Sequence, residues 1–202
     1  MRTLLAAALV AAGAAQAQTP LLDAIAEGKE PVAAILVLGG KVDLEARNDK
    51  RETPLHLAAE KGMRALTRLL LDAGARVRAR TATGETALHH AVLNEDPACA
   101  LLLLDAGADA RALNDHGESA LHWAAYGGND ALVRSLLERG ADPDTVNLDG
   151  NLPLHGAAAG GHASAVRLLL PRTRHPALRN LQGKTPQDLA RGRGHDAVAA
   201  LF

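Results

Sequence analysis

The chain has 202 residues, of which 48% are hydrophobic and only 1% are aromatic, so its core cannot be built on large rings. Ala and Leu dominate instead, which is what thin pairs of closely packed helices require. The formal net charge of −1 at pH 7 argues against nucleic acid as the main partner, because such proteins carry a strongly basic surface.

Residues 1–17 have the features of a secretory signal peptide. Arg2 supplies a single positive charge in the n-region, and an apolar run extends from Leu4 to Ala15. Ala15-Gln16-Ala17 then fits the small-x-small cleavage pattern. The short, alanine-rich form is typical of bacterial export signals, and no later stretch is long and apolar enough to span a membrane. We therefore expect cleavage after Ala17 and a soluble periplasmic protein, with secretion as the alternative destination. An ordinary N-terminal helix is the competing interpretation of this segment.

From residue 19 onward, one short pattern returns at a fixed period. Its copies begin at a small polar residue or its replacement, followed by Pro or Ala and, in all but the last copy, by Leu. Successive copies start 33 residues apart from Thr53 onward, and the first lies 34 residues before Thr53; the starting residues are Thr19, Thr53, Thr86, Ser119, Leu152 and Thr185. Self-similarity at such a period indicates stacked structural repeats rather than one globular core.

The pattern Thr53-Pro54-Leu55-His56, with Ala58-Ala59 and Gly62 downstream, resembles the ankyrin repeat over residues 19–202. The resemblance implies an all-α solenoid in which about six helix-turn-helix units stack and are joined by short β-hairpin loops. The predicted domain covers residues 18–202, with repeats near 19–48, 49–80, 81–113, 114–146, 147–179 and 180–202. We expect this array to be a monomer.

Two positions depart from the repeat pattern in an informative way. Arg51 occupies the hairpin position that later repeats give to glycine, so it is strained if that position needs a positive φ. Repeat five is the least regular, because Leu152 has no side-chain oxygen for capping and Gly156 removes a side chain from the first helix.

Several residues invite a catalytic or metal-binding interpretation. His56, His89, His122 and His155 recur at the repeat period, too far apart to share one ion, and the family resemblance implies that they bond the helix start and the neighbouring loop. Ser119, His122 and Asp115 superficially resemble a catalytic triad, but Ser119 and His122 occupy repeat-pattern positions. We therefore predict no enzymatic activity, no cofactor and no metal.

The resemblance also implies binding to a protein partner through the concave face. Glu52, Glu85 and Glu118 precede successive helix starts, and Leu93 and Tyr126 lie at the exposed ends of first helices. These five residues are the predicted contacts, and the acidic row favours a basic partner. The alternative is that glutamate is simply a common soluble hairpin residue. Trp123 matches the offset of Leu57, so we expect it to lie largely in the core.

The sequence as a whole predicts a non-catalytic protein–protein interaction module of the bacterial periplasm. It leaves open whether the partner is an enzyme that needs an accessory or chaperone-like protein, or a toxin or enzyme restrained by an immunity-type inhibitor. A periplasmic hydrolase and a metal-buffering protein that uses surface histidines are the rival classes.

Overall fold

The computed structural model describes residues 19–94 and 96–202, so the predicted signal peptide of residues 1–17 lies outside the described part. The described residues form twelve α-helices and one short 3-10 helix. They are α1 (Pro20–Ala26), α2 (Glu30–Leu38), α3 (Pro54–Glu60), α4 (Arg64–Asp72), α5 (Ala87–Ala91), α6 (Ala98–Asp105), α7 (Ala120–Gly127), α8 (Asp130–Glu138), α9 (Pro153–Ala159), α10 (Ala163–Leu169), η1 (Leu170–Arg172), α11 (Pro186–Gly192) and α12 (Asp196–Ala199). None of them is long and apolar enough to cross a lipid bilayer.

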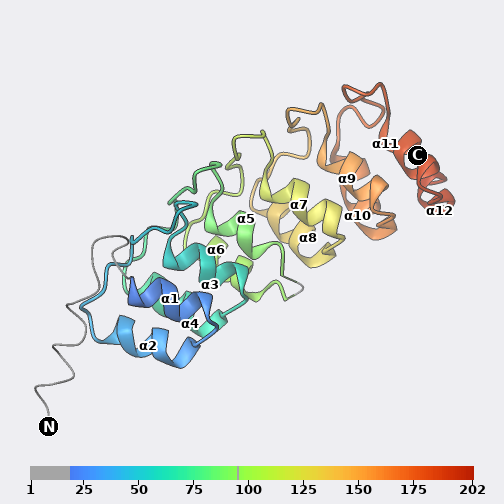
Figure 1. The fold of residues 1–202 in the computed structure, drawn as a ribbon. Coiled ribbons are helices and arrows are strands. Elements are labelled where there is room, and N and C mark those ends of the chain that lie inside the picture. The colour runs from blue at the N-terminus through green and yellow to red at the C-terminus, as the bar shows by residue number, and fades with distance from the viewer. Residues whose placement is uncertain (1–18, 95) are drawn as a thin grey trace, which may run out of the picture.

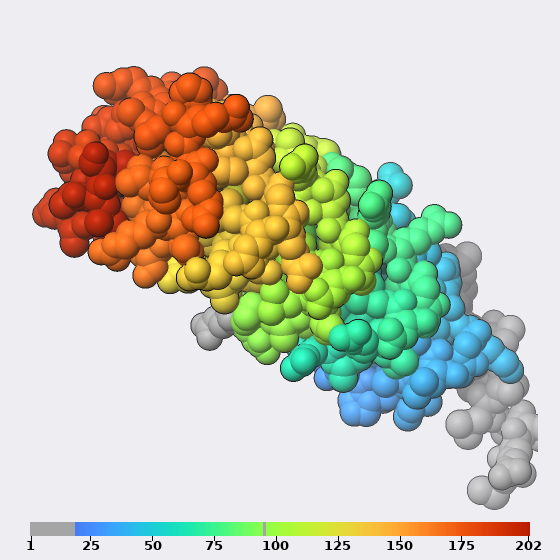
Figure 2. Space-filling model, turned by 180° about the vertical axis from the view of Figure 1, so that it is seen from behind, coloured from blue at the N-terminus to red at the C-terminus, as the bar shows by residue number. Residues whose placement is uncertain are grey.

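The helices form an elongated stack of pairs, which confirms the predicted all-α solenoid. Odd-numbered helices lie in one row and even-numbered helices in a second row, with the loops projecting on the side of the first (Figure 1). Each odd-numbered helix packs against the next, and each even-numbered helix does the same. Residue colours follow one another in bands along the length of the molecule, so each repeat contacts only its neighbours (Figure 2).

Buried side chains of the second helices and two rows of side chains in the first helices form the core. One row is leucine at the second position after each helix start, and its members are almost completely buried: Leu21, Leu55, Leu88, Leu121 and Leu154. The other is alanine three positions later: Ala24, Ala58, Ala91, Ala124, Ala157 and Ala190. Because alanine is small, adjacent first helices approach closely, and stacking buries an apolar face that one repeat alone would leave in water.

Four framework histidines tie each of repeats two to five to the repeat that follows it: His56, His89, His122 and His155. The Nδ1 atom of each ring accepts the backbone N–H of its own helix start at 3.0–3.2 Å. The Nε2 atom faces a backbone carbonyl of the next repeat, at 3.1–3.3 Å; these carbonyls belong to Glu85, Glu118, Asn151 and Lys184. Both ring nitrogens are used, and since Nδ1 accepts, each ring is neutral with its proton on Nε2. This confirms the structural role predicted for the row.

The predicted hairpins are tight hydrogen-bonded turns; among the described residues only Leu113 and Ser119 form a β-bridge. A polar side chain at the base of each turn accepts two backbone N–H groups from the turn, as Asn114 Oδ1 does from His116 and Glu118 at 3.0 and 2.9 Å. The tips then bond to one another along the array at 2.8–3.0 Å. The N–H groups of Ala82, Asp115, Leu148 and Leu181 donate to the carbonyls of Lys50, Thr83, His116 and Asp149.

Backbone conformation at the turn explains the unusual residue in repeat two. Arg51 has a φ of +61°, and it is the only non-glycine residue with positive φ in residues 19–94 and 96–202. The equivalent Gly84, Gly117, Gly150 and Gly183 have φ of +71° to +78°. A side chain in this region costs about 1–2 kcal/mol, so the strain predicted for Arg51 is present.

Repeat five keeps its helix start despite lacking a capping oxygen. The N–H of Leu152 donates to His155 Nδ1 at 3.0 Å, so one of the orphan donors of the helix is still satisfied. The Leu152 side chain is buried in the core. The missing hydroxyl is therefore offset by apolar burial, which the sequence pattern did not indicate.

We expect the protein to lose stability as the pH falls from 7 to 5. Burial lowers the pKa of His56 to about 4, with a further contribution from His90, and burial also lowers the pKa of His89, His122 and His155. The unfolded histidines have a pKa of about 6.5, so below that pH the unfolded chain binds more protons than the folded one. Their contribution is complete above about pH 6.5 and declines toward the folded-state pKa values, which urea unfolding at several pH values would measure.

His122→Gln isolates this effect, because a glutamine at the third helical position can still accept the N–H of the helix start but does not titrate. The variant should show a shallower loss of stability between pH 7 and 5. His116→Gln changes an exposed histidine outside the framework and should leave the slope as in the parent. An unfolding midpoint that stays constant over this range would contradict the expectation.

Arg51→Gly should raise the free energy of unfolding by about 1 kcal/mol, because glycine removes the positive-φ strain at some cost in chain entropy. Gly183→Ala is the matched opposite change: a Cβ there meets no atom within 4 Å, so only its φ of +71° opposes the substitution. It should destabilise by a similar amount. Equal urea unfolding midpoints for the parent and both variants would contradict this expectation, because they would show that a side chain at positive φ costs nothing in these turns.

Candidate functional site

The concave face, formed by the first helices and the turns, contains a groove of about 710 Å³ that spans repeats three to six. Its volume lies in the range of small-molecule and side-chain sites. The lining is mainly apolar at the helices and polar at the turns: Val92, Leu93, Asn94, Glu118, His122, Trp123, Tyr126, Gly127, Asn129, Asn147, Asp149, Asn151, Leu152, His155, Gly156, Ala159, Asn180, Gln182, Leu189 and Arg193.

Gly156 is the residue that opens the groove. The equivalent position holds a large side chain in repeats two, three, four and six, namely Leu57, His90, Trp123 and Leu189. Without one, α9 leaves space between Trp123 and Leu189. An added Cβ at Gly156 would lie 3.3 Å from Tyr126 Cβ, so the glycine also lets α7 and α9 approach closely. The sequence pattern marked Gly156 as an irregularity of repeat five but did not reveal that it shapes a binding surface.

Trp123 packs against the core, in line with the expectation, and its partly buried side chain also forms one wall of this groove. Its Nε1 donates to Glu118 Oε2 at 2.9 Å, and its ring meets His89 edge-on at a centroid separation of 5.5 Å. The offset from the helix start placed Trp123 on the right row, but a ring this large extends beyond the thin core of alanines. Held at both its edge and its N–H, it is a preorganised apolar surface.

Leu93 and Tyr126 lie at this surface as expected. Leu93 follows the end of α5 and is 63% exposed, while Tyr126 belongs to α7 and is 59% exposed. His162 Nε2 donates to the backbone carbonyl of Tyr126 at 2.9 Å, so the end of α7 is fixed by the next repeat. Exposed apolar side chains on a rigid backbone lose little conformational freedom on binding, which favours contact with a partner.

The three glutamates do not form a free acidic row. Glu52 is only 6% exposed, and its carboxylate accepts from Asn48 Nδ2 at 2.5 Å. Glu85 and Glu118 are half-buried; Glu85 faces His90 Nε2 at 3.2 Å, and Glu118 accepts from Trp123 and Asn114. Burial alone would raise the pKa of Glu118, but these hydrogen bonds outweigh it and hold the pKa below its ordinary value. Only Glu118 of the three lines the groove.

The remaining charges of the groove lie on opposite sides. Asp149, which is exposed at the tip of its turn, and the half-buried Glu118 both line the groove. Arg193 follows the end of α11, and its Nη1 donates to the carbonyl of Ala159 at 3.2 Å. The turn side is therefore acidic and the far helix end basic, whereas the floor between them is apolar.

The Ser119–His122 pair does not form a nucleophilic site. Ser119 Oγ lies 3.0 Å from His122 Nδ1, but Ser119 is buried and starts α7, and His122 Nε2 is already directed at the Asn151 carbonyl. A serine without access to substrate cannot attack one. Both residues serve the repeat framework.

Comparison with known proteins adds one finding about the family. A sequence model described as ankyrin repeats, in three copies, matches residues 2–81, 21–114, 69–147 and 121–202, and these overlapping matches together span nearly the whole chain. No curated protein matches the sequence.

Proposed function

Because the chain belongs to the ankyrin repeat family, whose repeats generally mediate protein–protein binding, we propose that it binds a protein partner through the groove of the concave face and has no catalytic role. The observation that supports this most directly is the apolar surface on which the exposed side chains of Leu93 and Tyr126 lie beside the partly buried Trp123, whose indole N–H is held by Glu118. Aromatic residues in preorganised positions are the usual centres of binding energy at interfaces.

The charges suggest the chemistry of the partner. An apolar side chain fits the space above Gly156, between Trp123 and Tyr126, while a Lys or Arg side chain would meet the carboxylates of Glu118 and Asp149 on the turn side. The partner is therefore a protein segment that places an apolar residue close to a basic one. The proposed partner is still basic, as expected from the sequence. Its contact surface, however, is the groove of repeats three to six, whereas the residues predicted from the sequence lie in repeats two to four.

The setting that we propose is the bacterial periplasm. Its support is the N-terminal sequence, in which Arg2, the apolar run and Ala15-Gln16-Ala17 fit an export signal. The partner would then be a periplasmic or exported protein. Both an enzyme assisted by this chain and a toxin restrained by it are compatible with such a groove.

Tyr126→Ala should weaken partner binding by about tenfold or more, because it removes a ring exposed at the centre of the surface. The partner is first captured from periplasmic extract on immobilised protein and identified by mass spectrometry, and its affinity is then measured by calorimetry. Leu93→Ala should act in the same direction. Thermal melts of both variants should resemble that of the parent, since neither side chain is buried.

Leu38→Ala is the control, because Leu38 is 72% exposed but belongs to the outer helix α2 of the first repeat. It should leave binding unchanged. Asp149→Asn should slow association with a basic partner at low salt more than it speeds dissociation. If Tyr126→Ala and Leu93→Ala bind as tightly as Leu38→Ala does, the groove is not the interface.

The export proposal predicts that the mature protein begins at Gln18. Expression in a Gram-negative host followed by fractionation and intact-mass measurement would test it, with Ala17→Leu as a variant that should block cleavage. Recovery of the intact chain, including Met1, from the cytoplasmic fraction alone would overturn the periplasmic setting.

A further inference from the structure

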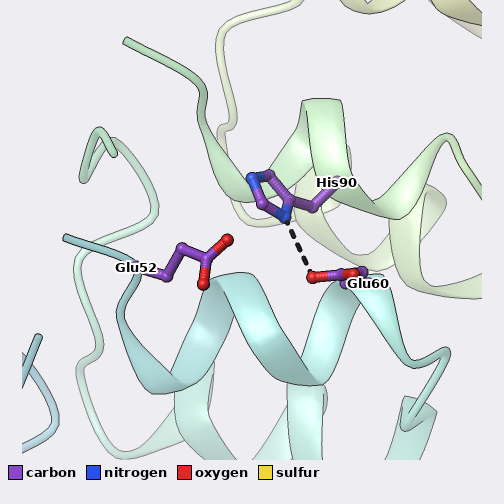
Figure 3. A group of neighbouring side chains, drawn as sticks. All are labelled: Glu52, Glu60 and His90. Carbon is purple, nitrogen blue, oxygen red and sulfur yellow. Dashed lines mark hydrogen bonds and ion pairs between the residues drawn. The ribbon is translucent and has the colours of Figure 1, made fainter. Parts of the chain in front are cut away.

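Outside the groove, three metal-ligating side chains meet between repeats two and three. Glu52 precedes the start of α3, Glu60 ends α3, and His90 belongs to α5 of the next repeat. Figure 3 shows the three side chains converging over α3. One ligand atom from each lies within 4.8 Å of the other two, and no ion is present.

The orientation of His90 leaves a lone pair facing carboxylates. Its Nε2 lies 3.2 Å from Glu85 Oε2, and its Nδ1 lies 3.4 Å from Glu60 Oε2. Ionised carboxylates only accept, and a neutral imidazole carries one N–H. If that N–H serves Glu85, then the Nδ1 lone pair faces Glu60 and Glu52. Acceptors directed at one point need a positive species between them, either a proton on Nδ1 or a bound metal ion.

The charges of the surrounding residues also favour a cation at this group. Within the described part of the chain, no Lys or Arg forms an ion pair with Glu52, Glu60 or Glu85. Glu52 and His90 are each only 6% exposed, so water screens their charges poorly. Glu60 keeps 47% of its side chain in solvent, which leaves an entry path for an ion.

The repeat framework does not account for this group. The position of His90 is filled by Leu57, Trp123, Gly156 and Leu189 in other repeats, and that of Glu60 by Leu93, Tyr126, Ala159 and Gly192. The framework histidines differ in that both of their nitrogens already bond the backbone. The sequence predicted no metal, because histidines one repeat apart are too distant to share an ion. That His90 meets two carboxylates of the neighbouring repeat is visible only in the structure.

We propose that Glu52, Glu60 and His90 bind one divalent zinc-class ion, with Glu85 orienting the imidazole. An imidazole nitrogen and carboxylate oxygens suit zinc, and a tetrahedral ion with bonds of about 2.0–2.1 Å sets its ligand atoms about 3.4 Å apart. His90 Nδ1 and Glu60 Oε2 already have that separation, and Glu52 completes the set by a small side-chain adjustment. A carboxylate on the other ring nitrogen, as Glu85 provides, is the usual outer partner of a zinc-bound histidine.

The ion would join repeat two to repeat three, because two ligands come from α3 and its approach and the third from α5. It would therefore stabilise the interface between these repeats and the folded chain as a whole, by an amount that grows with free zinc above the dissociation constant. This site is separate from the groove, and its existence does not depend on the proposed function.

The test is calorimetric titration of the chelator-stripped full chain with zinc chloride, with magnesium chloride as the comparison ion. We expect one zinc ion per chain, weak or no magnesium binding, and a rise in melting temperature with zinc. Glu60→Gln should weaken zinc affinity by about tenfold or more and abolish the thermal shift. Because Glu60 is half-exposed, this variant keeps its fold and remains informative even if His90→Gln unfolds.

His116→Gln and Glu27→Gln are the controls, since they remove an exposed histidine and an exposed carboxylate away from the group. Both should bind zinc like the parent. Equal zinc binding by Glu60→Gln and the parent would place the ion elsewhere and overturn the proposal. An absence of zinc binding to the parent would also overturn the proposal. If Glu60→Gln then changed stability only at acidic pH, the cation between the carboxylates would be a proton.

Discussion

The array depends on one hydrogen-bonded link that is repeated at the four junctions from repeat two to repeat six. A buried, neutral imidazole accepts the first N–H of its own helix and donates to a carbonyl of the following repeat, so capping and stacking use the same ring. Repeat six lacks this histidine link. Asp188 replaces the histidine there and bonds the backbone and hydroxyl of Thr185 within its own repeat. The link is therefore directional, and each repeat orders the turn of the next.

Features that depend on local spacing could be predicted from the sequence. The helix starts, the buried leucine and alanine rows, the role of the framework histidines and the strain at Arg51 all follow from the period and from what each position requires. The surroundings of side chains from neighbouring repeats could not be predicted. Glu52 looks like a soluble turn residue but is buried against Asn48, and Trp123 reaches the surface because its neighbours are small. Such environments depend on residues about one repeat away.

The groove and the His90 group arise in the same way, by a change of side-chain size or charge at an otherwise regular position. Gly156 creates space where other repeats fill it, and His90 introduces a second polar ring where other repeats are mostly apolar. Neither change disturbs the leucine and alanine rows, because those rows lie on a different face of the first helix. The fold thus separates the positions that hold the stack together from those that can vary.

The chain of bonds between turn tips has a consequence for how repeat length can vary. Each tip donates to the one before it, so a residue inserted in a turn would break the register with two neighbours at once. The segment between the second helix and the turn takes no part in that chain. The one extra residue in the array lies there: Gly40 to Asn48 is one residue longer than Gly74 to Thr81, while the helices of repeat one keep their spacing. Insertions and deletions are therefore confined to a single stretch of each repeat, on the approach to the turn.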